Sequence, residues 1–102
     1  MNKGGCTYII TYKTRTVLYV GVTSNLRARI WEHRTKHYPK SFTAKYNCDT
    51  IVWYEVFPTI MEAIDREKQI KGGSRAKKVA LINSLNPQWN DLWKKFKTYK
   101  RF

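Results

Sequence analysis

The sequence predicts a small α+β domain: a three-stranded antiparallel sheet flanked by helices. The first 57 residues contain three short runs rich in β-branched and aromatic residues, a composition typical of strands. Helix-start signals and apolar residues at helical spacing follow the second and third runs. The chain shows no internal repeat and no linker. We therefore expect one domain over residues 1–102, with a core over about 7–92 and a basic, aromatic tail over 93–102.

Two of the runs predict a β-hairpin, and the third predicts a further strand. Residues 7–12 (TYIITY) and 17–23 (VLYVGVT) flank the polar break KTRT, as the two arms of a hairpin do. Residues 49–57 (DTIVWYEVF) carry apolar side chains at successive positions, so we expect cover on both faces of this strand. Strict alternation would place Ile51, Trp53 and Phe57 on one face and Val52, Tyr54 and Val56 on the other.

The hairpin register decides what lies beside a glycine. If Tyr12 pairs with Val17, then Tyr8 stands opposite Gly21 and shares a sheet face with Tyr19. A slip by one residue would put the two tyrosines on opposite faces. A glycine inside a strand leaves room beside the backbone, so we expect Gly21 to open a pocket next to two phenols. The alternative is an ordinary pair of packing aromatics beside a bulge.

The first helix is expected directly after the hairpin. Ser24 can serve as its N-cap, and the helix should continue to about His37. An irregular basic loop (YPKSFTAKYN) follows it. The positions that recur at helical spacing are Leu26, Ile30 and His33.

Two further helices have clearer boundaries. Thr59 and Glu62 form a T-x-x-E capping box, and the glycine pair 72–73 ends that helix. Ser74 can cap the next helix, which should end before the Asn-Pro pair at 86–87. The tail QWNDLWKKFKTYKRF is expected to contain a short aromatic helix.

Charge indicates the kind of partner. The chain holds 20 Lys and Arg against 7 Asp and Glu, a formal net charge of +13. Nucleic acid favours such an excess, because each neutralised phosphate releases condensed counterions. A membrane surface would favour one basic amphipathic helix, whereas these charges are spread along the whole chain. The remaining alternative is that these charges only form a solvated surface that keeps the protein soluble.

The expected cellular location is inferred from segments that the sequence does not contain. No apolar run approaches the roughly 18 residues that span a bilayer. The chain carries no export signal, so we expect no membrane association and a cytoplasmic location. Cys6 and Cys48 lack metal-site spacing, and we expect two reduced thiols, with a single disulfide as the alternative.

Glu67 is an unusual residue for its position. It lies on an apolar helical stripe that should face the core, and carboxylates are seldom buried without a partner. Three explanations stay open: Glu67 pairs with a buried arginine, sits at the edge of the stripe, or faces a cleft and holds a metal ion. The other stripe members are Ile60, Ala63, Ile64 and Ile70.

Arg29 and His33 are four residues apart and share one side of the first helix. A guanidinium can bind two phosphate oxygens, and an imidazole can move a proton near neutral pH. Together they suit a phosphodiester, although many such pairs are simply solvent-exposed. His37 extends the same side by one turn.

Taken in order, these residues resemble the GIY-YIG nuclease domain, especially the small single-domain bacterial members related to the amino-terminal nuclease domain of the bacterial excinuclease. The resemblance covers about residues 7–92. Cys6-Thr7-Tyr8 stands where the family has GIY, and Tyr19-Val20-Gly21 stands where it has YIG, with ten residues between the tyrosines. The sequence departs from the family pattern at one place, where Cys6 and Thr7 replace Gly-Ile. A strand tolerates both replacements, and the tyrosine of the motif is retained.

The polar positions of the motif are also filled. Arg29 and His33 match the family's helical arginine and histidine, Glu67 matches its metal-binding glutamate, and Asn86 falls where an asparagine closes the motif. The resemblance implies a metal-dependent endonuclease that hydrolyses phosphodiester bonds in DNA with little sequence specificity. A structure-selective role in DNA repair or recombination would suit such an enzyme.

The resemblance also implies roles for these residues. Glu67 would hold one Mg²⁺ or Mn²⁺ ion, with water and phosphate completing its shell. Tyr8 would be the general base, in an environment shaped by Tyr19, and nearby cations would have to lower a phenol pKa that is ordinarily near 10. Arg29 would stabilise phosphate charge and His33 would relay a proton or orient the phenol. Asn86 would hold the architecture of the site.

Other functions and the expected contacts with the substrate are also part of the prediction. A nucleic-acid-binding module on the same fold, weak or inactive in catalysis, is the runner-up, and a protein that docks on an acidic partner is a third possibility. RNA stays open as a substrate beside DNA. Trp89 and Trp93 either pack in the core, which we favour, or contact bases. The expected nucleic-acid contacts are Arg27, Lys36, His37, Lys45 and Lys71.

Overall fold

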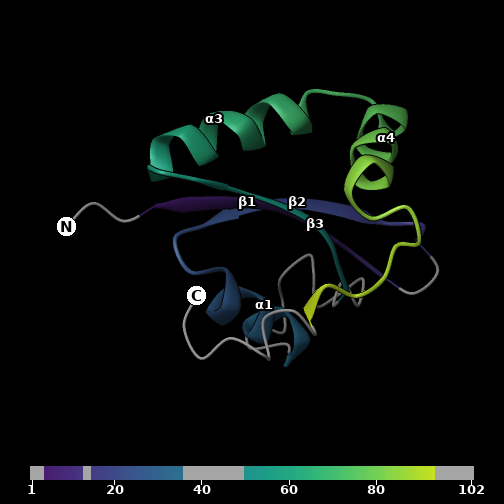
Figure 1. The fold of residues 1–102 in the computed structure, drawn as a ribbon, viewed down its shortest axis with the longest axis horizontal. Coiled ribbons are helices and arrows are strands. Elements are labelled where there is room, and N and C mark those ends of the chain that lie inside the picture. The colour runs from purple at the N-terminus through teal and green to yellow at the C-terminus, as the bar shows by residue number, and fades with distance from the viewer. Residues whose placement is uncertain (1–3, 13–14, 36–49, 94–102) are drawn as a thin grey trace.

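The computed structural model describes residues 4–12, 15–35 and 50–93, and it confirms the α+β prediction (Figure 1). The three strands form one antiparallel sheet in the order β2-β1-β3, so β1 is central and β2 is an edge strand. The elements are β1 (Gly5–Thr11), β2 (Leu18–Thr23), α1 (Leu26–Arg34), β3 (Thr50–Phe57), α3 (Ile60–Lys71) and α4 (Arg75–Leu85).

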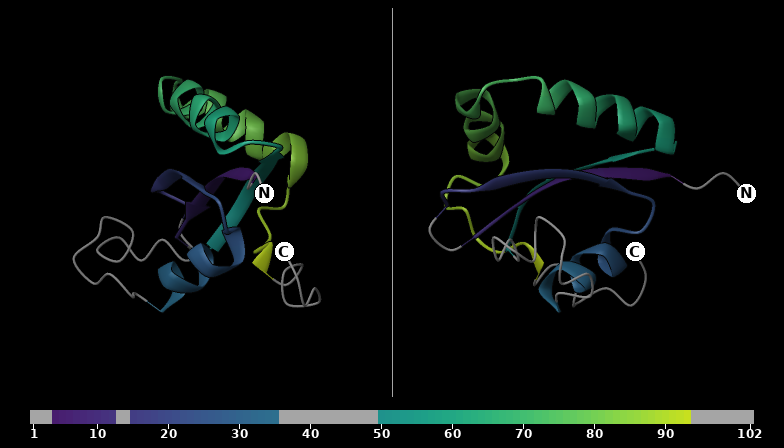
Figure 2. Two further views of the ribbon diagram at one scale, coloured as in Figure 1. Left: turned by 90° about the vertical axis from the view of Figure 1, so that its left-hand side faces the viewer. Right: turned by 180° about the vertical axis from the view of Figure 1, so that it is seen from behind.

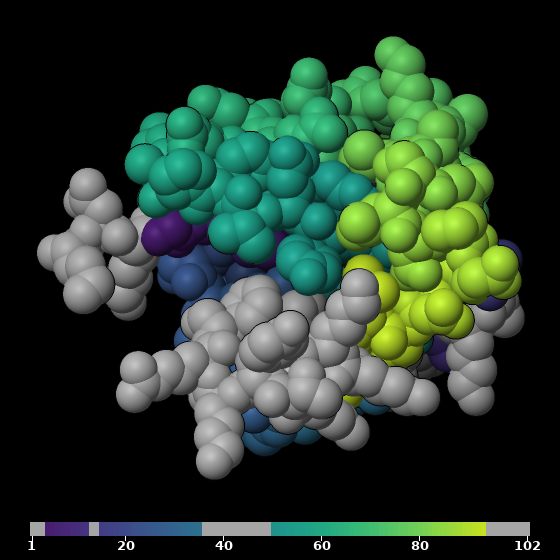
Figure 3. Space-filling model, in the orientation of Figure 1, coloured from purple at the N-terminus to yellow at the C-terminus, as the bar shows by residue number. Residues whose placement is uncertain are grey.

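Helices cover both faces of the sheet. Figures 1 and 2 show α1 on one face and α3 with α4 on the other. Two buried clusters result, one on each side. In Figure 3 the side chains of α3, β3 and α4 form a continuous surface that leaves little of β1 visible. The α1-side cluster contains Cys6, Tyr8, Ile10, Leu26, Ile30, Ile51 and Leu92. The α3-side cluster contains Ile9, Val20, Val52, Trp53, Ile70 and Ile82.

The hairpin has the predicted register. Tyr8 pairs with Gly21, and Ile10 pairs with Tyr19. Tyr8 and Tyr19 therefore share the α1 face of the sheet, where both pack in the same cluster. The β1–β2 pairing thus fixes which side chains can meet α1.

The predicted alternation along β3 was wrong at its centre. Val52 and Trp53 pack in the same α3-side cluster, while Ile51 packs on the α1 side. The register between β1 and β3 shifts between Ile9 and Ile10, which leaves one extra residue on β3. Such a bulge turns two successive side chains toward one face, which a period of two cannot anticipate.

The first helix is shorter than predicted and begins one residue later. Its N-cap is Asn25, whose side chain accepts a hydrogen bond from the backbone N–H of Ala28 at 3.1 Å, so the prediction of Ser24 was wrong. The helix ends at Arg34 rather than near His37. His37, the basic loop and most of the aromatic tail lie outside the described residues.

The caps predicted for the other two helices are confirmed. The Thr59 hydroxyl accepts from the backbone N–H of Glu62, and the Ser74 hydroxyl accepts from that of Lys77. Trp89 and Trp93 pack against the two core clusters, in agreement with the packing prediction.

Within the described residues, no helix has both the length and the apolar character needed to cross a membrane.

Cys6 is a free thiol, and Cys48 lies outside the described residues. The Cys6 side chain is buried on the α1 side of the sheet. Burial raises the pKa of this thiol to about 12, so the thiolate is scarcely formed near neutral pH. Cys6 therefore behaves as a small core residue.

Candidate active site

A buried hydrogen bond joins the central strand to α1. The Tyr8 hydroxyl lies 2.9 Å from Nε2 of His33. Tyr8 is 1% exposed and His33 is 6% exposed. A tyrosine and a histidine from segments 25 residues apart are thus brought together away from bulk water.

Gly21 makes room for the Tyr8 ring itself. A Cβ atom at Gly21 would lie 2.4 Å from both Cζ and the hydroxyl oxygen of Tyr8. The phenol therefore lies across the glycine, and the space predicted to be an open pocket is filled by this ring. Any larger residue at position 21 would displace the hydroxyl that bonds His33.

Tyr19 completes an aromatic group around the imidazole. The His33 ring centroid lies 5.8 Å from that of Tyr8 and 6.0 Å from that of Tyr19, the latter in an edge-on arrangement. Both distances fall within the range of favourable aromatic contacts. The histidine is therefore held by two tyrosines, one from each strand of the hairpin.

Burial keeps both members of this pair uncharged. Burial lowers the pKa of His33 to about 4, with the Arg29 charge acting in the same direction and Glu32 opposing the shift. Burial also raises the pKa of Tyr8 above its ordinary value, against the opposing influence of Arg29. The expectation that cations would lower the phenol pKa was wrong for the protein alone, because desolvation outweighs the guanidinium.

Glu32 is a residue of the site that the sequence interpretation missed. Its carboxylate lies 3.1 Å from the Arg29 guanidinium. The spacing of three residues on one helix was the signal that could have revealed it. This ion pair holds Arg29 beside the tyrosine–histidine pair.

Glu67 lies on the other side of the sheet, on α3. Its side chain is 17% exposed, and Oε2 lies 3.5 Å from the Lys71 ammonium. The partner is a lysine rather than a buried arginine, so two of the three explanations, the edge of the stripe and a metal site, fit this placement. Lys71 also lies 6.0 Å from the centroid of the Tyr19 ring. Lys71 thus links Glu67, around the β2 edge, to the aromatic group.

The metal prediction depends on one carboxylate. Among the described residues, no group of three or more His, Cys, Asp or Glu side chains could hold a metal ion. Mg²⁺ is commonly bound through one or two carboxylates, with water and substrate phosphate as its other ligands. A mostly buried Glu67 whose contact is an exposed lysine fits that type of site.

Asn86 is buried at the carboxyl end of α4, apart from the aromatic group. Its side-chain amide donates to the carbonyls of Val52 and Asn90, and its Oδ1 accepts from the Asn90 backbone. These bonds attach the segment after α4 to β3. Its predicted role in shaping the active site stays a prediction.

Two of the five predicted nucleic-acid contacts lie in the described residues. Arg27 lines a shallow hollow on α1 together with Trp31 and Trp93. Lys71 lines a hollow of about 340 Å³ beside Tyr19. Lys36, His37 and Lys45 lie outside the described residues.

Comparison with known proteins gives a family. The GIY-YIG catalytic domain matches residues 4–80, which include the aromatic group and Glu67 but not Asn86. A UPF0213 protein of Syntrophus aciditrophicus is 35% identical over 81 residues, covering 79% of this chain and 91% of that protein. A UPF0213 protein of Staphylococcus haemolyticus is 36% identical over 75 residues, covering 74% and 89%. No solved structure matches significantly. The chain belongs to the GIY-YIG catalytic domain family, a family of nucleases.

Proposed function

We propose that the protein is a metal-dependent endonuclease that hydrolyses phosphodiester bonds in DNA with little sequence preference. The observation that carries the proposal is the buried 2.9 Å contact between the Tyr8 hydroxyl and His33. Packing alone does not require two ionisable groups to be desolvated and bonded to each other, whereas a proton relay does. The net charge of +13 supports a polyanionic substrate.

The two pKa directions define how the relay would work. The raised pKa of Tyr8 keeps the phenol protonated near neutral pH, so Tyr8 does not act as a preformed phenolate. The lowered pKa of His33 leaves its imidazole neutral and able to accept a proton. The phenol oxygen would take a proton from the attacking water while its own proton passes to Nε2 of His33. This step requires the histidine tautomer that carries its proton on Nδ1.

The positive charge that stabilises the phosphate would come from two cations beside the aromatic group. Arg29 brings positive charge to Tyr8 and His33, and Lys71 brings it to Tyr19. Charge-assisted bonds from these cations to phosphate oxygens would stabilise the transition state. Glu67 would hold one Mg²⁺ or Mn²⁺ ion, which supplies Lewis-acid stabilisation of phosphate charge when bound. The Lys71 ammonium would then leave Glu67 for the substrate.

A binding module without catalysis is the second candidate. The observation that favours it is the Glu67–Lys71 contact, which already satisfies the carboxylate without a metal ion. In this case the fold would bind nucleic acid through its basic surface alone. The two candidates differ in whether Glu67 has a function beyond this ion pair.

The test is cleavage of labelled linear, nicked, flapped and four-way DNA, with matching RNA strands, in Mg²⁺ or Mn²⁺. Glu67→Gln should abolish cleavage and leave binding intact. Asp65→Asn is the matched control, because Asp65 is an exposed carboxylate on the same helix. Binding without cleavage by the wild type would reject the nuclease in favour of the binding module. Equal cleavage by the wild type and Glu67→Gln would instead reject Glu67 as the residue that holds the metal ion.

A further inference from the structure

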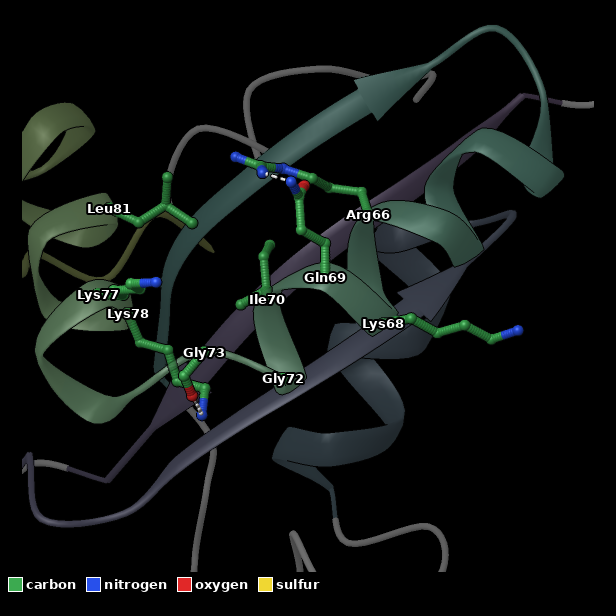
Figure 4. A pocket seen from close by; sticks show the side chains of 9 residues that line it. All are labelled: Arg66, Lys68, Gln69, Ile70, Gly72, Gly73, Lys77, Lys78 and Leu81. Carbon is green, nitrogen blue, oxygen red and sulfur yellow. Dashed lines mark hydrogen bonds between the residues drawn. The ribbon is translucent and has the colours of Figure 1, made fainter.

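A basic cavity lies between α3 and α4, on the sheet face opposite α1 (Figure 4). Its volume is about 410 Å³. Arg66 and Gln69 line it from α3, and Lys77 and Lys78 line it from α4. None of the described residues that line the cavity is acidic. The surroundings therefore favour an anionic ligand.

Two lysines supply most of the charge that a ligand would meet. Arg66 is already held by Glu55 at 3.0 Å and by Gln69 at 2.6 Å. Lys77 and Lys78 extend from the side of α4 that faces α3 (Figure 4). The Lys78 ammonium donates one hydrogen bond, to the carbonyl of Gly73 at 3.2 Å, and an ammonium has three N–H groups.

The helix that carries these lysines adds to their effect. They occupy the first turns of α4, whose initial turn contains no acidic residue. The amino-terminal end of a helix carries partial positive charge, which no carboxylate of that turn offsets here. The lysine charges and the helix end therefore act in the same direction.

The cavity is connected to the candidate active site through one shared residue, Lys78. Lys78 also lines the hollow of about 340 Å³ in which Tyr19 and Lys71 lie. Tyr19 contacts His33, and Lys71 contacts Glu67. A basic path therefore runs from the active site around the β2 edge to the α3–α4 cavity.

We propose that this cavity binds a backbone phosphate of the nucleic-acid strand, at a distance along the strand from the phosphate that is cut. The inference rests on the proposed function, since it takes the strand to pass the aromatic group. The continuous path past Lys71 favours a strand over a small free phosphate as the occupant. Lys77 and Lys78 would then extend the DNA footprint to the second layer of helices and make longer substrates bind more tightly.

The experiment compares single lysine substitutions in DNA binding. Fluorescence anisotropy with chelator present, so that nothing is cut, gives affinity across a range of salt concentrations for Lys77→Gln and Lys78→Gln. Lys68→Gln is the matched control. Lys68 also lines the cavity, but its ammonium points away from the cavity, so the substitution removes the same charge from outside the ligand's reach (Figure 4). Each cavity variant should lose about five- to tenfold in affinity near 0.1 M salt, with a salt slope smaller by about 0.7–0.9. Lys68→Gln should change both much less.

Two further arms decide the occupant. Shortening the oligonucleotide should remove the difference between wild type and Lys77→Gln, because a short strand cannot reach both sites. In an NMR titration, inorganic pyrophosphate that perturbs the Lys77 amide, while DNA affinity is independent of both lysines, would assign the cavity to a free phosphate and overturn the proposal.

Failure of this inference can be told from failure of the proposed function. Equal losses for Lys77→Gln and Lys68→Gln, in a protein that does cleave DNA, would overturn the cavity assignment alone. A wild-type protein that neither binds nor cleaves nucleic acid would overturn both. Because Lys78→Gln also removes the bond to Gly73, Lys77→Gln carries the conclusion if the former variant unfolds.

Discussion

The two faces of the sheet use polar residues in opposite ways. On the α1 face, Tyr8 and His33 are buried, bonded to each other and kept neutral by desolvation. On the α3–α4 face the buried cluster is apolar, and the charged Lys77 stays exposed at a cavity rim. In the proposed function, burial prepares Tyr8 and His33 for proton transfer, whereas exposure to solvent keeps Lys77 ionised for binding.

The largest effect should follow from removing one oxygen on the α1 face. Tyr8→Phe removes the hydroxyl that bonds His33, and the proposed relay then lacks its first acceptor. Single-turnover cleavage should fall by about 10²- to 10⁴-fold, the usual size of general-base catalysis, with DNA affinity unchanged. Tyr12→Phe, at the end of the same hairpin arm, is the control and should cleave normally. Equal rates for the two variants would contradict the relay.

Acid should destabilise the protein through the same face. The pKa of His33 is lowered from 6.5 to about 4, so below pH 6.5 the unfolded chain binds more protons than the folded one. Stability is fully present above pH 6.5 and is lost as pH falls toward 4, by up to about 3 kcal/mol. Urea unfolding across this range measures the loss. His33→Gln should flatten the profile between these limits, and an unchanged slope in that variant would contradict the assignment.

Gly21→Ala tests the packing that positions the phenol. The new Cβ would meet the Tyr8 ring at 2.4 Å, and this buried ring has little space to move. Overpacking of this kind costs about 1–3 kcal/mol in the free energy of unfolding, and cleavage should fall as well. Gly72→Ala is the control, since its Cβ would meet only ordinary contacts of 3.4 Å or more. Similar stability for both variants would show that the ring can shift.

The smallest effect is expected on the α3 face. The buried Thr7 hydroxyl donates to the carbonyl of Ala63 at 2.7 Å, which joins β1 to α3. Thr7→Val keeps the shape and loses this bond, so stability should fall by about 1 kcal/mol while the cleavage rate is retained. Thermal unfolding of Thr7→Val, compared with that of Thr7→Ser, which keeps the hydroxyl, measures this loss. A large loss of activity in Thr7→Val would contradict a purely structural role for this bond.

The sequence was sufficient for those features that depend on local patterns. The hairpin register followed from the length of a polar break, and the Thr59 and Ser74 caps followed from side chains that bond nearby backbone. The pairing of Tyr8 with Gly21 could be predicted from that register alone. The order of Tyr8, Tyr19, Arg29, His33 and Glu67 was enough to identify the family, which comparison confirmed.

Features that depend on tertiary contacts could not be predicted. The β3 bulge places Val52 and Trp53 on one face because of pairing with β1, which no period reveals. Ser24 and Asn25 are both favourable N-cap residues, so residue type alone could not show that Asn25 is the cap. The raised pKa of Tyr8 depends on how deeply the ring is buried, and sequence shows burial only as a pattern.

The proposed mechanism depends above all on a neutral His33 that accepts the Tyr8 proton, and nitrogen-15 NMR of the imidazole observes that ring itself. Spectra of the wild type across pH, with His33→Gln to assign the signal, give both the pKa and the tautomer. We expect a ring that is neutral at pH 7, titrates near 4 and carries its proton on Nδ1, with Nε2 facing the phenol. A ring that titrates near 6.5, or that carries its proton on Nε2, would rule out this relay.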